Sequence, residues 1–303
     1  MTLANVIMIG AQKSGTSSLC KFLSEHPQCA VSNPKEPNFY SRAINLASPE
    51  RYERCFRAAN GSEPARIDGT TTYLADPRIA GRIAGHLGRD IKLIAILRAP
   101  AARTYSGFLH MVKRGHERRS WQEIFESLPD DPDAAMAAER QGIDTALASG
   151  RIEAGPYVRQ YDDVLWNYRY LGNSLYSRLI QPYLAEFPRE RLMVLIYEEM
   201  FARPDLLRAR LGDFLGVDPD AFGEKPPLYN DTRLPDLDSL LGIAIEQARW
   251  IKRGNFTRVR PHLIKAAPSK APSELTARLK RIAADETVFW SDFLGRDLTR
   301  LGW

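Results

Sequence analysis

The chain has 303 residues, of which 44% are hydrophobic and 26% are charged. This balance is typical of a folded globular protein and excludes a disordered or fibrous chain. Lysine and arginine number 42 against 37 aspartate and glutamate residues, and the resulting net charge of +5 is compatible with an anionic ligand. The basic residues form no dense run, so the sequence does not favour nucleic acid as a partner.

The cysteines and the apolar runs indicate the compartment. Three cysteines, an odd number without a CxxC pair, predict a reduced, intracellular protein with neither a disulfide framework nor a structural zinc site. No apolar run approaches the roughly 18 residues that a membrane span requires. The first run, residues 6–9, leads directly into a glycine turn and is too short for a signal peptide. We therefore expect a cytoplasmic protein with no membrane partner.

Short apolar runs alternate with amphipathic segments along the chain. This alternation predicts an α/β fold, with a mainly parallel central sheet that helices flank on both faces, in a single domain spanning 1–303. A charged stretch at 115–160 lacks a regular pattern and predicts a surface insertion or lid. Strands are expected at 5–9, 28–32, 65–68, 91–97 and 192–197, and helices at 17–26, 49–59, 77–87, 101–114, 174–187, 205–215 and 273–293.

A glycine-rich loop, residues 10–17 (GAQKSGTS), joins the first strand to the first helix. Successive backbone N–H groups and a helix N-terminus favour an anion in this setting, and Lys13 adds a full positive charge. The spacing almost matches GxxxxGK[ST], but Thr16 stands where the lysine of nucleotide triphosphatases belongs. The loop therefore predicts a phosphate site that differs from that of an ATPase or GTPase.

Two further strand ends carry polar residues that suit an anion site. Arg98 follows the strongest strand, where Walker-type enzymes place an acid for magnesium, and an arginine there suits a second phosphate. Ser106 lies one or two helical turns further on, where it can face the same anion or be a neutral helix serine. Lys35 and Glu36 lie in a proline-bracketed loop after the second strand. This pair is either an exposed charge pair or a general base beside a cation.

Taken in this order, these segments resemble the sulfotransferases that use 3′-phosphoadenosine-5′-phosphosulfate (PAPS). The likeness is strongest to the heparan-type carbohydrate branch and its bacterial relatives. IGAQKSGTSSL, HPQ and KEPNFYS match the opening of that branch, and LRAPAARTYSGF matches its second signature. FPRERLMVLIYEEM and FLGRDLTRLGW also look like family segments, so the resemblance covers nearly the whole chain.

The resemblance implies a role for each matched position. Glu36 would be the catalytic base, and Lys13 would lie near the bridging oxygen of the phosphosulfate. Arg98 and Ser106 would hold the 3′-phosphate, and Tyr197 would lie near the adenine. A late basic segment would complete this site, with Lys265 or Lys270 as alternatives to residues 252–254. The implied cofactor-binding set is Lys13, Ser14, Gly15, Thr16, Ser17, Arg98, Ser106, Tyr197, Lys252, Arg253 and Gly254, with no metal ligand.

The chain departs from the heparan-type pattern where that branch recognises its acceptor. Asn38 and Ser41 stand where relatives often carry a histidine and an acid, and DGTTTY at 68–73 replaces a Glu-x-Thr-Pro-x-Tyr segment. His110 or His116 is the alternative base. Aromatic residues between 157 and 183 line an acceptor cleft or pack in the core: Tyr157, Tyr161, Trp166, Tyr168, Tyr170 and Tyr176.

The sequence as a whole predicts a sulfotransferase that moves a sulfuryl group in line from PAPS to an acceptor. The acceptor would be a hydroxyl or amine of a small molecule or carbohydrate, and the product nucleotide would be 3′,5′-adenosine bisphosphate. Two alternatives stay open at this point. One is a nucleoside-phosphate kinase of P-loop type, which requires magnesium, and the other is a non-catalytic module that binds adenosine bisphosphate. The oligomeric state and the choice between O- and N-sulfation are not readable from the sequence.

Overall fold

The computed structural model describes residues 3–57, 62–154, 157–228 and 270–303. The chain divides into two compact units. Among the described residues, the first unit comprises 3–57, 62–99, 157–164 and 176–228, and the second comprises 100–154, 165–175 and 270–303.

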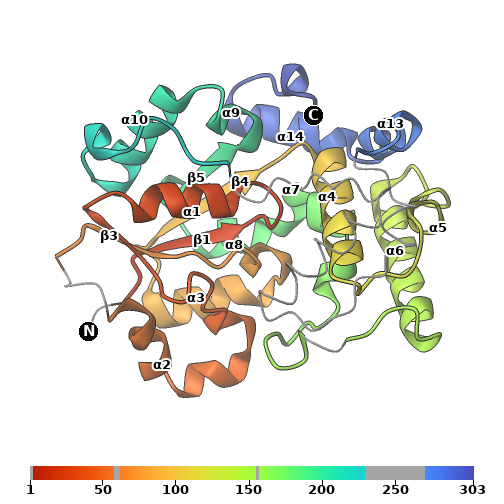
Figure 1. The fold of residues 1–303 in the computed structure, drawn as a ribbon, viewed down its shortest axis with the longest axis horizontal. Coiled ribbons are helices and arrows are strands. Elements are labelled where there is room, and N and C mark those ends of the chain that lie inside the picture. Colours follow the sequence, from red (N-terminus) through yellow and green to blue (C-terminus); the bar gives the residue numbers. More distant parts are fainter. Residues whose placement is uncertain (1–2, 58–61, 155–156, 229–269) are drawn as a thin grey trace, which may run out of the picture. The chain divides into compact units, whose positions relative to one another are not determined.

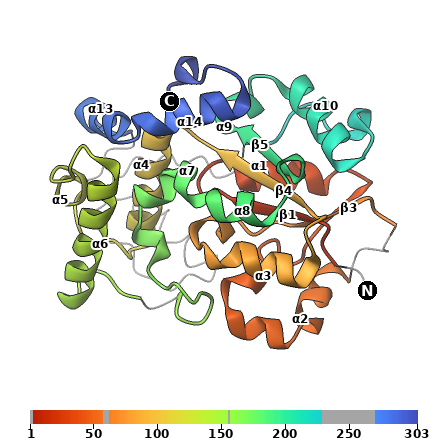
Figure 2. The ribbon, with the colours of Figure 1, turned by 180° about the vertical axis from the view of Figure 1, so that it is seen from behind.

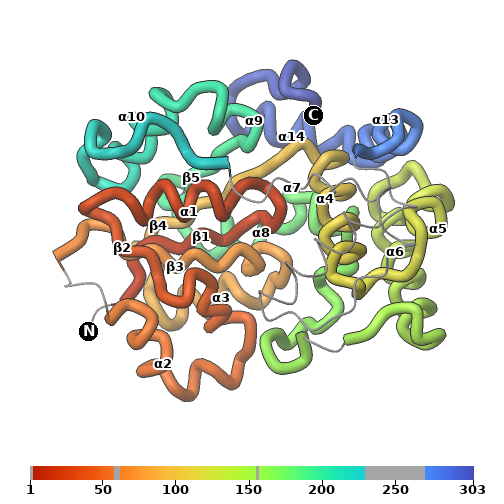
Figure 3. The backbone as a smooth tube through the Cα atoms, in the orientation of Figure 1, coloured from red at the N-terminus to blue at the C-terminus, as the bar shows by residue number. Residues whose placement is uncertain are grey.

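A five-stranded sheet forms the centre of the first unit (Figure 1). Its order is β2-β3-β1-β4-β5, and every neighbouring pair is parallel. The expected parallel α/β architecture is therefore confirmed. β2 lies at one edge of the sheet beside β3 (Figure 3). The strands are β1 (Val6–Gly10), β2 (Cys29–Val31), β3 (Ala65–Asp68), β4 (Lys92–Leu97) and β5 (Leu192–Ile196).

Helices cover both faces of this sheet, and the central strands are therefore buried on both sides. On one face, α1 (Thr16–Ser24), α9 (Tyr197–Met200) and α10 (Pro204–Leu215) contribute side chains to a common apolar cluster with the strands. On the opposite face lie α3 (Arg78–Leu87) and α8 (Gln181–Glu186), as seen in Figure 2. The unit also contains α2 (Glu50–Glu53) and α7 (Tyr176–Leu179).

The second unit is helical in its described residues. It contains α4 (Pro100–Lys113), α5 (Trp121–Phe125), α6 (Pro132–Ala148), α13 (Ser273–Ile282) and α14 (Ala284–Leu294). Short 3-10 helices occupy Phe39–Ser41, Ala43–Ala47, Arg54–Phe56, Tyr73–Ala75, Arg189–Arg191 and Pro219–Ala221 in the first unit, and Trp166–Tyr168, Gly172–Ser174 and Thr299–Leu301 in the second.

The expectation that 115–160 lacks regular structure is wrong. The proline- and aspartate-rich stretch is a helix start: Asp131 caps α6 by accepting a hydrogen bond from the N–H of Ala134, and Pro132 opens its first turn. Ser120 and Glu123 form a capping box at the start of α5. Whether this segment moves as a lid stays a prediction.

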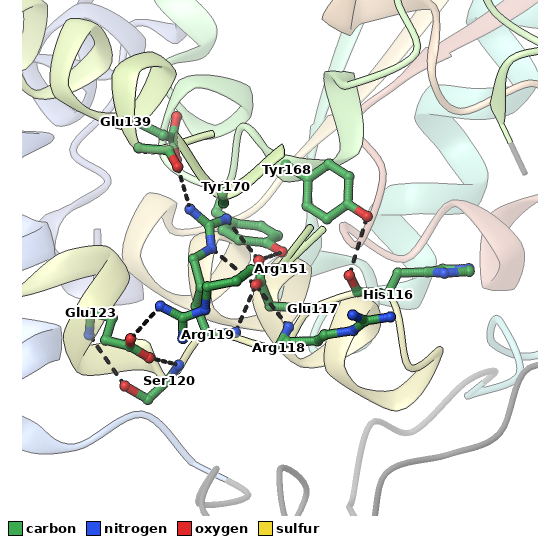
Figure 4. A network of polar contacts seen from close by, with 12 residues as sticks. His116, Glu117, Arg118, Arg119, Ser120, Glu123, Glu139, Arg151, Tyr168 and Tyr170 are labelled. Atoms are coloured by element: carbon green, nitrogen blue, oxygen red, sulfur yellow. Dashed lines mark hydrogen bonds and ion pairs between the residues drawn. The ribbon is translucent and has the colours of Figure 1, made fainter. Parts of the chain in front are cut away.

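A buried ion pair anchors the segment that precedes α5 (Figure 4). Glu117 is fully buried and accepts hydrogen bonds from Nε and from one terminal nitrogen of Arg119, at 3.0 and 2.8 Å. The hydroxyl of Tyr170 donates to the same carboxylate at 2.8 Å. Because a buried charge requires such partners, this network holds residues 117–119 against the stretch around residue 170.

Two long helices expected from the sequence are each divided. The predicted helix 174–187 is α7 followed by α8, because Pro182 has no N–H to donate to the carbonyl four residues earlier. The predicted helix 273–293 is α13 followed by α14, with Ala283 between them outside helical geometry. The apolar period is continuous across both breaks, so the pattern alone does not reveal them.

Candidate functional site

The candidate site lies where the five parallel strands end. In such sheets, ligands bind outside the carboxyl ends of the strands. In the sheet, β3 and β2 lie on one side of β1, and β4 and β5 lie on the other side. The spatial order of the strands places several of the predicted residues, together with Thr71, along one edge of the first unit. These are Lys35 and Glu36 after β2, Thr71 after β3, the loop 11–15 after β1, Arg98 after β4 and Tyr197 after β5.

The loop between β1 and α1 presents backbone N–H groups to an anion. Gly15 is the N-cap residue of α1, has φ of 87°, and provides no side-chain cap to the first turn. Lys13 adopts φ of 73°, a left-handed conformation that is rare outside glycine and concentrates at functional sites. Ser14 is fully buried, and its Oγ has no hydrogen-bond partner among the described residues. The loop is thus shaped as an anion nest at a helix N-terminus.

Tyr197 and Arg98 are held against this loop. A Cβ on Gly15 would lie 2.7 Å from Cδ2 of Tyr197, so the ring packs directly on the glycine. The guanidinium carbon of Arg98 is 4.7 Å from the centre of the same ring, a cation–π distance. Arg98 also donates from one terminal nitrogen to the carbonyl of Lys13 at 3.4 Å. The structure therefore brings together predicted residues from three different strand ends.

Arg98 retains hydrogen-bonding capacity at this position. Its Nε is buried and has no partner within the described part of the chain. Since buried donors in folded proteins are almost always paired, this nitrogen and the hydroxyl of Ser14 are suited to an anionic ligand.

The other predicted residues belong to the second unit or lie outside the described residues. Ser106 lies on α4 in the second unit with a buried hydroxyl, and its phosphate role stays a prediction from the sequence. His110 and His116 also belong to the second unit, and burial lowers the pKa of His116. Lys252, Arg253 and Gly254 lie outside the described residues, as does Lys265; Lys270 is described and belongs to the second unit.

The two carboxylate oxygens of Glu36 differ in their hydrogen bonds. Its Oε1 accepts hydrogen bonds from Nζ of Lys35 at 2.8 Å and from Oγ1 of Thr71 at 3.3 Å. No described residue donates to Oε2 of Glu36. The side chain is 35% exposed, so a ligand can reach it. A carboxylate oriented in this way can accept a proton from a nearby hydroxyl or amine.

Buried Asp68, at the end of β3, organises the loop that supports Glu36. Its Oδ2 accepts hydrogen bonds from the hydroxyls of Tyr52 and Tyr73 at 3.0 Å each, and its Oδ1 accepts the N–H of Thr70. Burial raises the pKa of Asp68, while the hydrogen bonds from Thr70 and the tyrosines oppose that rise. Thr70 in turn accepts the N–H of Asn38. Sequence reasoning missed this support, although an aspartate at a strand end signals it.

Asn38 links the base loop to one of the predicted aromatic residues. Its side chain donates to the carbonyl of Glu36 at 3.1 Å and accepts from the hydroxyl of Tyr161 at 3.1 Å. All the aromatics predicted for an acceptor cleft are buried, so packing accounts for their positions: Tyr157, Tyr161, Trp166, Tyr168, Tyr170 and Tyr176. The sequence left both readings open, and burial favours the core.

The fold and the residues at the carboxyl ends of its strands define the class of the protein. It is an α/β protein with an anion-binding loop, an arginine (Arg98) beside that loop and a carboxylate (Glu36) nearby. Within the described ranges, no three or more His, Cys, Asp or Glu residues are grouped so as to hold a metal ion. Comparison with known families then identifies the particular family, because the sulfotransferase domain matches residues 3–226. The chain belongs to the sulfotransferase family.

Individual relatives agree with this assignment. The chain is 24% identical over 283 residues to the membrane-associated sulfotransferase kil1 of Dictyostelium discoideum, covering 75% of this chain and 59% of that protein. It is 24% identical over 215 residues to heparan sulfate glucosamine 3-O-sulfotransferase 3B1 of Mus musculus, covering 71% and 46%. The chain thus spans about half the length of these curated relatives.

A solved structure confirms the fold. The crystal structure of a sulfotransferase from Alicyclobacillus acidocaldarius superposes with a TM-score of 0.65 at 23% identity, covering 99% of both chains.

Within the part of the chain that is described, no helix combines the length and the apolar character that crossing a membrane requires.

Proposed function

We propose that this protein transfers a sulfuryl group from PAPS to a hydroxyl or amine of a small-molecule or carbohydrate acceptor. The observation that carries the proposal is the convergence of the Lys13 loop, Arg98, Tyr197 and Glu36 on one edge of a parallel sheet. Membership of the sulfotransferase family supports PAPS as the donor, since the family generally uses it. Relatives named as heparan sulfate sulfotransferases support a carbohydrate acceptor.

The residues present fit a nucleotide with two separate anionic groups. Residues 13–17 would hold the 5′-phosphosulfate through backbone N–H groups, hydroxyls and Lys13. Arg98 would hold the 3′-phosphate with its unpaired Nε, joined by Ser106 and by residues 252–254 on the basis of the sequence resemblance. Tyr197, whose ring lies on Gly15, would form the wall beside the adenine.

Glu36 would take the acceptor proton on Oε2, while Lys35 and Thr71 hold its other oxygen in place. Lys13 and the loop N–H groups would stabilise the negative charge that builds on the bridging oxygen. When bound, PAPS supplies the sulfuryl group, whose bond to the bridging oxygen breaks with the electron pair left on the 5′-phosphate. The acceptor atom would form the new bond to sulfur as its proton moves to Glu36. The products would be the sulfated acceptor and 3′,5′-adenosine bisphosphate.

Calorimetric titration with 3′,5′-adenosine bisphosphate and with 5′-AMP tests the donor site. The bisphosphate should bind more tightly, because a charge-assisted contact to the 3′-phosphate contributes about 1.5–3 kcal/mol. Arg98→Ala should remove most of that preference. The matched control is Arg89→Ala, which breaks only a surface pair with Glu186. Equal affinity for both nucleotides, or a preference that survives in Arg98→Ala, contradicts the assignment.

Radiolabelled PAPS with a panel of carbohydrate and small-molecule acceptors tests the reaction itself. Transfer of the label to any acceptor supports a sulfotransferase. Tight bisphosphate binding without transfer to any member of the panel would support a non-catalytic binding module. The cytoplasmic location stays a prediction, which fractionation of cells that express the protein would check.

A further inference from the structure

Lys35 joins the two halves of the candidate site. Its Nζ donates to Oγ of Ser17, in the first turn of α1, at 3.3 Å and to Oε1 of Glu36 at 2.8 Å. Ser17 belongs to the loop assigned to the phosphosulfate, and Glu36 is the assigned base. One ammonium group therefore spans the distance between the anion nest and the carboxylate. Sequence reasoning treated Lys35 only as the charge partner of Glu36.

The path of the Lys35 side chain depends on a glycine in the neighbouring strand end. A Cβ on Gly69 would lie 2.7 Å from the carbonyl oxygen of Lys35 and 3.1 Å from its Cγ. The same Cβ would lie 2.8 Å from Sγ of Cys20 on α1. Any larger residue at this position would therefore force Lys35 or Cys20 to shift. The backbone of Lys35 is also fixed, because its carbonyl accepts the hydroxyl of Ser32 at 2.9 Å.

We propose that Lys35 is a catalytic residue whose ammonium group binds the three non-bridging oxygens of the sulfuryl group as it is transferred; this rests on the proposed function. In an in-line displacement, the leaving oxygen and the acceptor atom occupy opposite ends of the reacting sulfur. The three remaining sulfuryl oxygens lie between those ends. Lys13 is assigned to the leaving oxygen and Glu36 to the acceptor atom. An ammonium group that contacts both Ser17 and Glu36 would therefore lie beside the three sulfuryl oxygens between them.

The chemistry of an ammonium group suits this position. It has three N–H donors, and contacts to Ser17 and Glu36 account for two of them among the described residues. Its side chain is 32% exposed, so an anion can reach it without rearrangement of the core. A fixed cation here orients the sulfuryl group towards the acceptor and compensates its charge.

Binding measurements without an acceptor test this role. Lys35→Met keeps an unbranched side chain, one atom shorter than lysine, and removes the charge. We expect the Kd for PAPS to rise about tenfold or more, because a charge-assisted contact to the sulfuryl oxygens is lost. The Kd for 3′,5′-adenosine bisphosphate, which has no sulfuryl group, should change by less than about threefold. Lys21→Met is the matched control, since Lys21 on α1 forms a surface pair with Glu25, and it should change neither Kd.

A double variant separates direct contact from an effect through the base. If Lys35 only positioned Glu36, removing its charge would have no further effect once Glu36 is glutamine. We expect instead that Lys35→Met weakens PAPS binding by a similar factor in the Glu36→Gln background. Lys35→Arg, which retains a cation, should bind PAPS more tightly than Lys35→Met. Thermal melting of each variant checks that it is folded.

The outcomes separate the two proposals. A wild-type protein that binds the bisphosphate but neither binds PAPS nor transfers sulfate overturns the proposed function. A wild-type protein that transfers sulfate, with a Lys35→Met variant that binds PAPS normally, overturns only the role of Lys35. Equal weakening of PAPS and bisphosphate binding, or no effect in the Glu36→Gln background, also overturns it.

Discussion

Glu117→Gln tests whether a buried ion pair holds the second unit together. Glu117 has no exposed surface, and its Oε2 lies 2.8 Å from both a terminal nitrogen of Arg119 and the hydroxyl of Tyr170. Glutamine keeps the shape but removes the charge, and its amide nitrogen can face Arg119 only as a second donor. Because breaking a buried pair leaves an uncompensated charge, the free energy of unfolding should fall by about 3–5 kcal/mol.

Glu123→Gln is the matched control within the same unit. Glu123 pairs with Arg151 at 2.7 Å, but both side chains are 44% exposed. Exposed pairs contribute about 0–1 kcal/mol, and glutamine preserves the capping box with Ser120. The control should therefore lose no more than about 1 kcal/mol.

Equilibrium unfolding in urea, followed by tryptophan fluorescence, measures both variants. Trp121 and Trp166 are buried in the second unit and report on its unfolding. A Glu117→Gln variant that is as stable as Glu123→Gln would refute the reasoning, since burial would then add nothing to the value of the pair.

Three further outcomes are expected. Glu36→Gln should lower kcat by about 10²–10⁴ with the bisphosphate Kd unchanged, whereas His110→Ala and His116→Ala should turn over normally; the reverse pattern would assign the base to a histidine. EDTA should leave bisphosphate binding and transfer intact, and loss restored by magnesium would favour a kinase. Burial raises the pKa values of the Cys20 and Cys29 thiols to about 12, so both stay protonated at pH 8. A thiol reagent should therefore reach them only after unfolding in urea, and rapid labelling of the native protein would contradict their burial.

Local sequence determined the elements and the anion loop. The apolar runs placed all five strands to within one or two residues, because a buried parallel strand needs a continuous apolar segment. The apolar runs also located the anion loop at residues 10–17 and Arg98, because each directly follows a predicted strand. Cap signals at Ser120 and Asp131 were also present in the sequence, but the charged composition around them suggested irregular structure.

The contacts that make the edge a site were decided only by the tertiary structure. Residues 17 and 35, 15 and 197, and 36 and 71 meet because the strands are ordered β2-β3-β1-β4-β5, an order that no local pattern contains. Burial of Asp68 and its hydrogen bonds from the hydroxyls of Tyr52 and Tyr73 likewise follow from packing, although these partners lie only 16 and 5 residues away along the chain. Periodicity reports which face of an element is apolar, whereas the partners of a polar side chain depend on which strand ends become neighbours.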